Sequence, residues 1–511
     1  MKNKVYANAS IVTGLSVAER SLGFLYRILL SRLIGAEGLG LYQVALSLFS
    51  LFLTLGTGGI PITVSRMISK SKAENNRRGE SRSVGAGVAA CLLLTLPVCL
   101  LLWVFGGRMH FLFADGRTFS VFRILLLGLC FSSVYAVIRG SWWGNKEFLA
   151  PSIVEIAEEA VMVIVGIALL QTVPSPLIGA KKAAWAVVLS YLFSFSFSLV
   201  WFFVRGGKIS APKTHLKPLF TASMPITAVR ASGSLVNSAV AVLLPLMLIK
   251  AGFAESEALK IFGVVSGMVL PVLFVPSTII GSIALVLVPE LSEDFYRKNY
   301  QRLYANLARG LKFSFLISCA LLPFFFTLGE DLGALAFSNP TAGRMIKHGC
   351  FILIPMSLTM ISNAMLNSMG FEKQTFFFYF IGAAALLVCV LFLPAVCGGY
   401  AYLIGLGLSF TATALCNLVF LHKKCPIYQK RGGQVCVHEF LPILLGVLPI
   451  TLFGCLLRNL TSYFMGEILS LVFCLLAMLI FTLLYYFATG QIEFPKKEPK
   501  CKNECKIEKK V

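Results

Sequence analysis

The chain consists largely of long apolar runs separated by short polar stretches. The runs are about 18–25 residues long, and they lie near residues 8–34, 39–65, 84–105, 119–138, 149–171, 183–204, 219–249, 261–289, 310–328, 349–369, 375–396, 401–421, 441–457 and 465–488. Because an α-helix rises 1.5 Å per residue, one such run crosses the hydrocarbon core of a bilayer, roughly 30 Å thick. The ten-residue alternating segments of membrane β-barrels do not match this pattern. It predicts an all-α integral membrane protein with about fourteen transmembrane helices.

Composition supports lipid as the surrounding solvent. Of the 511 residues, 57% are hydrophobic and only 13% are charged. A soluble domain needs more charged surface than this. The net charge of +22 would suggest a nucleic-acid partner in a soluble protein. Here the basic residues lie mainly between apolar runs, so we expect membrane lipids around the chain and no nucleic acid.

The distribution of lysine and arginine predicts the orientation. With a cytoplasmic N-terminus, alternate connections carry basic clusters near 66–82, 205–217, 297–312 and 423–431, followed by the lysine-rich tail. The other connections are short and poor in lysine and arginine. We therefore expect a multi-pass protein of the cytoplasmic membrane. The positive-inside rule predicts that both of its termini face the cytoplasm. The first apolar run lacks a small-residue cleavage site and is expected to be a retained helix.

A faint internal repeat predicts two lobes. Helix four ends in Arg139-Gly-Ser-Trp-Trp-Gly144, and helix ten ends in Leu366-Asn-Ser-Met-Gly370, each followed by a tight charged turn. A spacing of six helices is typical of carriers built from two similar bundles. We predict an N-lobe at 1–218 (helices 1–6), a C-lobe at 219–432 (helices 7–12), helices 13 and 14 at 433–490, and a basic cytoplasmic tail at 491–511.

Charged residues inside the first apolar run are candidates for function, since ionisable groups in membrane helices are costly. Arg20 and Arg27 are two helical turns apart and share a face. Glu19 either neutralises an arginine or acts directly. Arg32 lies near the outer end, where it is expected to reach the lipid headgroups.

Helices five and seven carry the other buried candidates. Glu155, Glu158 and Glu159 stand at i, i+3 and i+4 on one helical face. They form either structural salt bridges with the helix-one arginines or a proton- or cation-sensitive gate. Arg230 on helix seven follows the proline at 225. Because arginine binds phosphate bidentately, Arg20, Arg27 and Arg230 favour an anionic substrate with a diphosphate head over a cationic drug.

No residue pattern predicts a cofactor, a metal or an enzyme. Most of the 14 cysteines fall in apolar runs, where thiols pack as small hydrophobes. Cys501 and Cys505 lack a second pair or a nearby histidine, so we expect no metal site. A Walker-type phosphate loop is missing. A membrane glycosyltransferase would need more carboxylates or a sizeable loop on the outer face.

Several motifs resemble one family along nearly the whole chain. The run from Arg20 to Tyr42 reads RSLGFLYRILLSRLIGAEGLGLY and is similar to the helix-one signature of the stage V sporulation protein B family. Shorter matches are GIPITVS at 59–65, Met224-Pro225-Ile-Thr with Arg230, and VPELS at 288–292. These proteins are polysaccharide-type flippases of the MOP superfamily, which also contains the MurJ-type lipid II flippases and the MATE transporters.

The resemblance implies fourteen helices in two lobes that flip an undecaprenyl-diphosphate-linked sugar precursor by alternating access. In lipid II flippases, helix-one arginines hold the diphosphate. Arg20 matches one of those positions, whereas Tyr26 occupies the second, with Arg27 beside it. Glu158 matches the acid of the helix-five motif, and Glu155 and Glu159 replace amides. Helices 13 and 14 would form a groove for the polyprenyl tail.

Residues and resemblance together predict a membrane flippase rather than an enzyme. The leading substrate is lipid II for spore cortex peptidoglycan, and the chain is expected to work as a monomer. Arg20, Arg27, Arg230 and Tyr26 would bind the lipid-linked saccharide, while Glu19, Glu155, Glu158 and Glu159 would serve gating or ion coupling. Two alternatives stay open: a multidrug or cation antiporter of the same superfamily, and a flippase for capsule- or teichoic-type oligosaccharide lipids.

Overall fold

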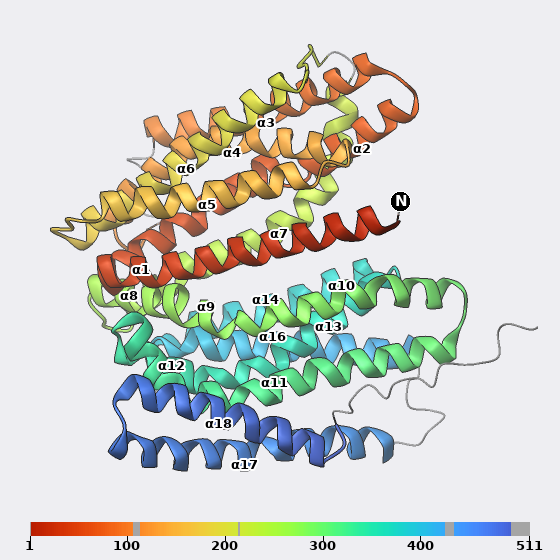
Figure 1. Cartoon of the computed structure of the whole chain (residues 1–511). Coiled ribbons are helices and arrows are strands. Elements are labelled where there is room, and N and C mark those ends of the chain that lie inside the picture. The colour runs from red at the N-terminus through yellow and green to blue at the C-terminus, as the bar shows by residue number, and fades with distance from the viewer. Residues whose placement is uncertain (1, 106–112, 213–214, 425–433, 492–511) are drawn as a thin grey trace, which may run out of the picture. The chain divides into compact units, whose positions relative to one another are not determined.

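The computed structural model describes residues 2–105, 113–212, 215–424 and 434–491, and within them every regular element is helical (Figure 1). The elements are α1 (Lys2–Thr57), α2 (Ile60–Ala73), α3 (Arg77–Phe105), α4 (Arg117–Gly144), α5 (Leu149–Leu169), α6 (Pro176–Val204), α7 (Leu216–Lys250), α8 (Glu255–Gly263), a π-helix (Val264–Val269), α9 (Leu270–Leu273), α10 (Val275–Tyr296), α11 (Tyr300–Phe337), α12 (Pro340–Gly349), a 3-10 turn (Cys350–Ile352), α13 (Leu353–Ser368), α14 (Glu372–Phe392), α15 (Pro394–Cys397), α16 (Tyr400–Lys424), α17 (Gln434–Phe464) and α18 (Glu467–Ala488). The predicted basic tail lies outside the described residues, apart from Gln491.

Thirteen helices among the described residues are long and apolar enough to cross a membrane. The first of these segments, Gly14–Ala73, has 60 residues and covers most of the predicted span 8–34 and all of the span 39–65. Its backbone turns at Gly35, where φ is 70° and ψ is 176°, a region that favours glycine. The 21-residue helix α5 also has the length of a span, although it carries three glutamates. The all-α membrane fold predicted from hydropathy is confirmed.

The predicted single helix at 261–289 is interrupted in the structure. A π-helix occupies Val264–Val269, and the chain breaks at Phe274 between α9 and α10. Pro271 and Pro276 flank this break and lack the N–H donors that a continuous helix needs. In contrast, α7 runs from Leu216 to Lys250 through two internal prolines.

Two helical turns support the internal repeat. At the end of α4, the Glu147 N–H donates to Trp142 O at 2.9 Å. Six spans later, at the end of α13, the Phe371 N–H donates to Leu366 O at 3.0 Å. In each turn the residue before the donor has positive φ, 86° in the case of Gly370, as in a Schellman helix end. The division at residues 218 and 432 stays a prediction.

The chain forms two compact units. The first contains Met1–Val275, Glu330–Ile352 and Glu372–Thr413, and the second contains Pro276–Gly329, Leu353–Phe371 and Ala414–Val511. In the first unit, α1 packs against α4, α5, α6, α7 and α8. In the second, α17 packs against α18. All the site residues predicted from the sequence belong to the first unit.

Arg32 is exposed and bonded to the end of another helix, and its expected contact with lipid headgroups stays a prediction. Its Nε donates to Ala336 O at 2.7 Å, and its Nη2 donates to Leu335 O. Both carbonyls belong to the last turn of α11, where helices leave carbonyl groups without an intrahelical partner. Arg32 therefore caps the end of α11, and its charge complements the helix dipole.

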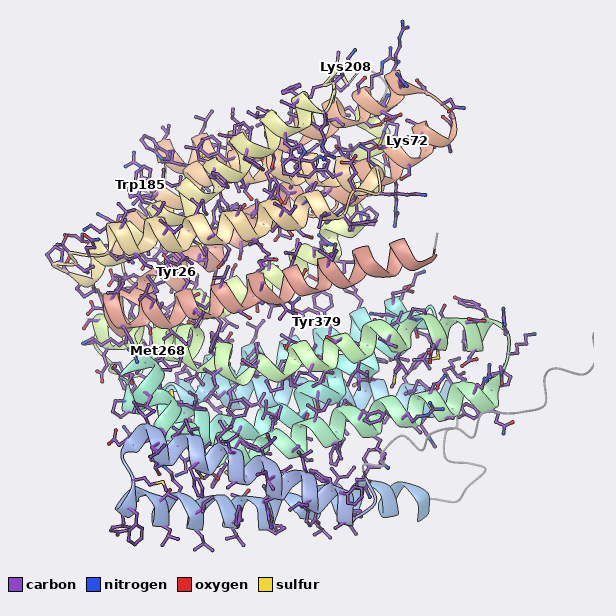
Figure 2. The ribbon with its side chains drawn as sticks, viewed as in Figure 1. Tyr26, Lys72, Trp185, Lys208, Met268 and Tyr379 are labelled. Carbon is purple, nitrogen blue, oxygen red and sulfur yellow. The ribbon has the colours of Figure 1, made fainter. Side chains whose placement is uncertain are left out.

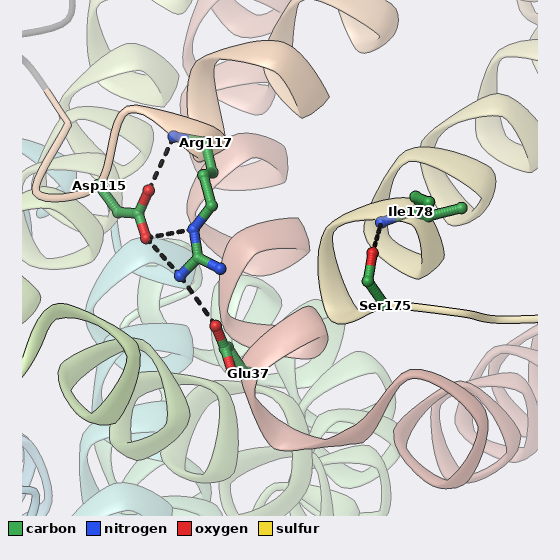
Figure 3. A network of polar contacts seen from close by, with 5 residues as sticks. All are labelled: Glu37, Asp115, Arg117, Ser175 and Ile178. Atoms are coloured by element: carbon green, nitrogen blue, oxygen red, sulfur yellow. Dashed lines mark hydrogen bonds and ion pairs between the residues drawn. The ribbon is translucent and has the colours of Figure 1, made fainter.

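A cluster of three charged residues joins α1 to the start of α4 (Figure 3). The Arg117 guanidinium lies 2.8 Å from Glu37 Oε1 and 2.7 Å from Asp115 Oδ2. Asp115 Oδ1 also accepts the backbone N–H of Arg117 at 2.7 Å. Because Asp115 is only 3% exposed, its carboxylate depends on these contacts for the hydrogen bonds that water would otherwise supply.

Candidate functional site

The candidate site is built on α1 and α5, which lie side by side in the first unit and run in the same direction. A Cβ placed on Gly23 of α1 would lie 2.8 Å from Glu159 Oε1 of α5. Two turns further along α5, a Cβ on Gly166 would lie 2.6 Å from the hydroxyl oxygen of Tyr26, which is one turn after Gly23 on α1. Figure 2 shows Tyr26 in this region between the two helices. The two glycines therefore allow the acidic face of α5 to approach the charged face of α1.

The first carboxylate of α5 pairs with Arg139, which the sequence pointed to only as part of the repeated helix end and not as a site residue. Arg139 Nη1 donates to Glu155 Oε1 at 2.9 Å. Among the residues the structure describes, no salt bridge joins Glu155 to Arg20 or Arg27. Of the two interpretations of these glutamates, the salt bridge to helix one does not hold for Glu155, which pairs with α4 instead. Arg139 directly follows the apolar run 119–138, and a charge in that position was the available signal.

The other two carboxylates of α5 have polar surroundings of different kinds. The Glu158 side chain lies near Ser194 of α6 and within electrostatic reach of Glu155 and Arg139. Glu159 lies within electrostatic reach of Glu19 and Arg27 of α1. All three α5 glutamates are partly buried. The structure thus brings the four predicted gating residues Glu19, Glu155, Glu158 and Glu159 into one cluster.

The two helix-one arginines are exposed. Neither Arg20 nor Arg27 forms a salt bridge within the described part of the chain. Both lie on a membrane-spanning helix, where an unpaired cation is costly unless it meets water or an anionic ligand. Their guanidinium groups offer planar forks of N–H donors, which suit carboxylate or phosphate oxygens.

Arg230 lies apart from this cluster on α7. Its Nη1 donates to Gly58 O at 3.1 Å, at the junction between α1 and α2. Next to it, the Gly59 N–H donates to Thr227 Oγ1 at 2.9 Å. The side chain of Arg230 is otherwise exposed. Arg230 therefore connects α7 to the break between α1 and α2. Its other N–H groups remain available to a further ligand.

Tyr26 is buried, in contrast to the arginines on either side of it. It is 3% exposed, and its hydroxyl has no hydrogen-bond partner within the described residues. A buried hydroxyl without a partner loses its bonds to water. Tyr26 therefore packs α1 against Gly166 of α5 in this conformation.

We expect Tyr26→Phe to leave the free energy of unfolding unchanged or to raise it by up to about 1 kcal/mol, because the lost hydroxyl makes no hydrogen bond. Titration with a denaturing detergent measures this. The matched control is Tyr486→Phe, since Tyr486 is 1% exposed and donates to Ile443 O at 3.3 Å. That variant should lose about 1 kcal/mol. Equal losses in the two variants would mean that the Tyr26 hydroxyl has a partner.

The part of the chain that the structure describes contains no group of three or more His, Cys, Asp or Glu side chains able to hold a metal ion. Chemically, the guanidinium groups of this site can bind carboxylate or phosphate oxygens and can exchange one such partner for another.

Comparison with known proteins gives the wider class. The lipid II flippase MurJ in its inward closed conformation has a TM-score of 0.67 at 16% identity, covering 94% of this chain and 99% of that chain. A multidrug resistance MATE family transporter of the MOP superfamily, in its inward-facing conformation, has a TM-score of 0.68 at 16% identity, covering 81% and 98%. The protein is a multi-pass membrane protein with the fold of MOP superfamily transporters.

The sequence comparisons identify the family. The model of the polysaccharide biosynthesis protein family matches residues 5–295, and the chain belongs to this family. Stage V sporulation protein B of Bacillus subtilis (strain 168) is 24% identical over 384 residues, covering 70% of this chain and 74% of that protein. Lipid II flippase MurJ of the same organism is 23% identical over 173 residues, 32% of each chain. The resemblance inferred from the helix-one motif is confirmed.

Proposed function

We propose that the protein is a flippase that moves an undecaprenyl-diphosphate-linked cell-wall precursor across the cytoplasmic membrane by alternating access. The leading substrate is lipid II for spore cortex peptidoglycan. Membership of the polysaccharide biosynthesis family and the likeness to a sporulation protein and a lipid II flippase support this proposal. Both termini would face the cytoplasm, and α17 and α18 would hold the polyprenyl tail.

One observation carries the proposal. Arg20 and Arg27 stand exposed on a membrane-spanning helix without a salt bridge in the described residues. A diphosphate supplies the charge and the oxygen acceptors that two guanidinium groups require. Arg230 would add a third cation on α7. Glu19 and the α5 glutamates would respond to substrate by exchanging partners with these arginines, which is their proposed gating role.

The test is rescue of flipping in cells. Native lipid II flippases are depleted, the protein is expressed, and lipid II accessible on the outer leaflet is measured. Wild type should restore the signal, whereas Arg20→Ala should lose at least about 90% of it, because a lost charge-assisted hydrogen bond weakens binding by about tenfold or more. Membrane levels of the two proteins are compared by immunoblot.

The control variant is Arg297→Ala, which removes an arginine with a 76% exposed side chain in the turn after α10. It should rescue like wild type. Equal rescue by Arg20→Ala would remove Arg20 from the substrate path. Failure of well-expressed wild type to rescue would exclude lipid II and favour a capsule- or teichoic-type lipid, testable by rescue of a mutant lacking that flippase.

A second candidate function is a multidrug or cation antiporter. It is favoured by the cluster of four carboxylates that Glu158 forms with Glu19, Glu155 and Glu159. Cations bind to carboxylates, and a MATE transporter shares the fold. The exposed arginines on the same helix oppose a cationic substrate. Expression in a strain without its own drug exporters distinguishes the two: an antiporter lowers ethidium accumulation, and a lipid flippase does not.

A further inference from the structure

Arg139 lies on α4 between two aromatic rings of its own helix. Its guanidinium carbon is 5.7 Å from the centre of the Tyr135 ring and 5.1 Å from that of Trp143. These residues stand four before and four after Arg139, so all three form one row along the helix. Both distances are within the range of roughly 6 Å for cation–π attraction. The rings hold the guanidinium in place without using its N–H donors.

The hydrogen bonding of this guanidinium is incomplete. Arginine has five N–H donors, and Nη1 donates to Glu155 Oε1 at 2.9 Å. The Nε of Arg139 is buried and has no hydrogen-bond partner within the described residues. A carboxylate can bind the guanidinium edge with two parallel bonds, yet Glu155 makes one. A buried donor without a partner is costly and uncommon in folded proteins.

Arg139 is close enough to the charged residues of α1 to interact with them electrostatically. The charges of both Arg20 and Arg139 act on the carboxylate of Glu19. The nearby hydroxyl of Tyr135 is buried and also lacks a hydrogen-bond partner within the described residues. A single group of oxygens at this point could accept from Nε of Arg139 and from the Tyr135 hydroxyl. Phosphate oxygens can accept from several donors at once, whereas Glu155 presents only Oε1 to Arg139 in this structure.

We propose that Arg139 is a phosphate-binding residue of the substrate path, and that Glu155 occupies its place when no substrate is bound. The inference rests on the proposed flippase function, and the ligand is the diphosphate of a polyprenyl-linked lipid. Substrate arrival displaces the Glu155 carboxylate from Arg139, and the two aromatic rings keep the guanidinium in position during this exchange. Glu155 thereby competes with the substrate for one arginine.

Binding of farnesyl diphosphate, a short polyprenyl diphosphate, to the purified full-length protein in phosphatidylcholine nanodiscs tests this inference. Arg139→Gln should weaken binding by about ten- to a hundredfold, because a charge-assisted bidentate contact is lost. Glu155→Gln should strengthen binding by severalfold, because the competing charge is removed. A purely structural ion pair predicts the opposite for Glu155→Gln: binding no tighter than that of wild type.

The matched control is Arg205→Gln. Arg205 lies 3.3 Å from Glu147 and stacks at 5.3 Å on Trp201, so it repeats the same chemistry at a more exposed position. Its loss should leave binding unchanged. The double variant Arg139→Gln with Glu155→Gln removes both charges, which keeps the fold free of an unpaired ion. It should bind as weakly as Arg139→Gln, and wild-type affinity in this double variant would overturn the inference.

The remaining outcomes separate this inference from the proposed function. If wild type binds farnesyl diphosphate and Arg139→Gln binds equally well, Arg139 is not a ligand and the flippase proposal stands. If wild type binds no farnesyl diphosphate, both fail. Inorganic pyrophosphate is the second probe: weaker binding with the same dependence on Arg139 supports the lipid headgroup as the ligand. Equal affinity for the two probes would assign the site to free diphosphate and overturn the lipid assignment.

Discussion

Gly40→Ala is expected to lower the free energy of unfolding by about 3 kcal/mol, the upper end of the usual cost of overpacking. Gly40 lies on α1 where this helix meets α8. A Cβ at this position would lie 2.8 Å from the carbonyl carbon of Leu259 and closer still to its oxygen. The obstacle is backbone, so no side chain can rotate away. The two helices would have to separate.

The contact is reciprocal, which increases the expected effect. A Cβ on Gly263 of α8 would lie 2.6 Å from the backbone nitrogen of Gly40. Small residues at such crossings allow membrane helices to pack through van der Waals contact. Unfolding is measured by titration with a denaturing detergent, and Gly40→Ala should also reduce the yield of folded protein.

The control for Gly40 is the same substitution at Gly281. This residue lies in α10, and no heavy atom stands within 4 Å of the position its Cβ would take. Gly281→Ala should stabilise the protein by about 0.5–1 kcal/mol, because alanine has the higher helix propensity. If both variants were equally stable, the close α1–α8 contact would be wrong.

Arg117→Met is expected to cost about 2 kcal/mol of unfolding free energy, less than removal of one partner from a fully buried ion pair, because the Arg117 side chain is 39% exposed. The variant keeps an apolar stem but leaves Asp115, 3% exposed, and Glu37, with 14% side-chain exposure, as unpaired neighbouring carboxylates. Like charges in a site of low dielectric repel strongly. The Arg117 backbone N–H should still bind Asp115, so the start of α4 is retained.

Arg297→Met is the matched control for Arg117→Met. Arg297 pairs with Glu293 at 2.8 Å, similar to the distances in the α1–α4 cluster, but the side chains are 76% and 58% exposed. Its removal should cost less than about 1 kcal/mol, as for other surface ion pairs. Neutralising both acids in Arg117→Met, by Glu37→Gln and Asp115→Asn, should recover part of the loss. A loss no greater than that of Arg297→Met would show that burial of the cluster contributes nothing.

Hydropathy and local spacing predicted most of the fold. The apolar runs gave the membrane helices, because the thickness of the bilayer imposes a minimum length on each span. The charged face of α5 followed from the i, i+3, i+4 spacing of its glutamates. The repeated turns after Gly144 and Gly370 were also visible in the sequence. These features depend on residues close together along one helix.

The partners of the charged residues depended on tertiary structure. Glu155 pairs with Arg139 rather than with a helix-one arginine, and Arg32 caps α11, about 300 residues away. Tyr26 is buried although Arg27 next to it is exposed. Each outcome follows from the rotation and register of neighbouring helices.

By itself, the sequence thus determined a helical membrane protein, the positions of its charges along each helix, and the family to which it belongs. The tertiary structure decided which charges meet, which side chains are buried and where a long helix breaks. The physical reason is that transfer into lipid depends on each segment alone. Pairing of charges, in contrast, depends on the close approach of helices at glycines such as Gly23 and Gly166.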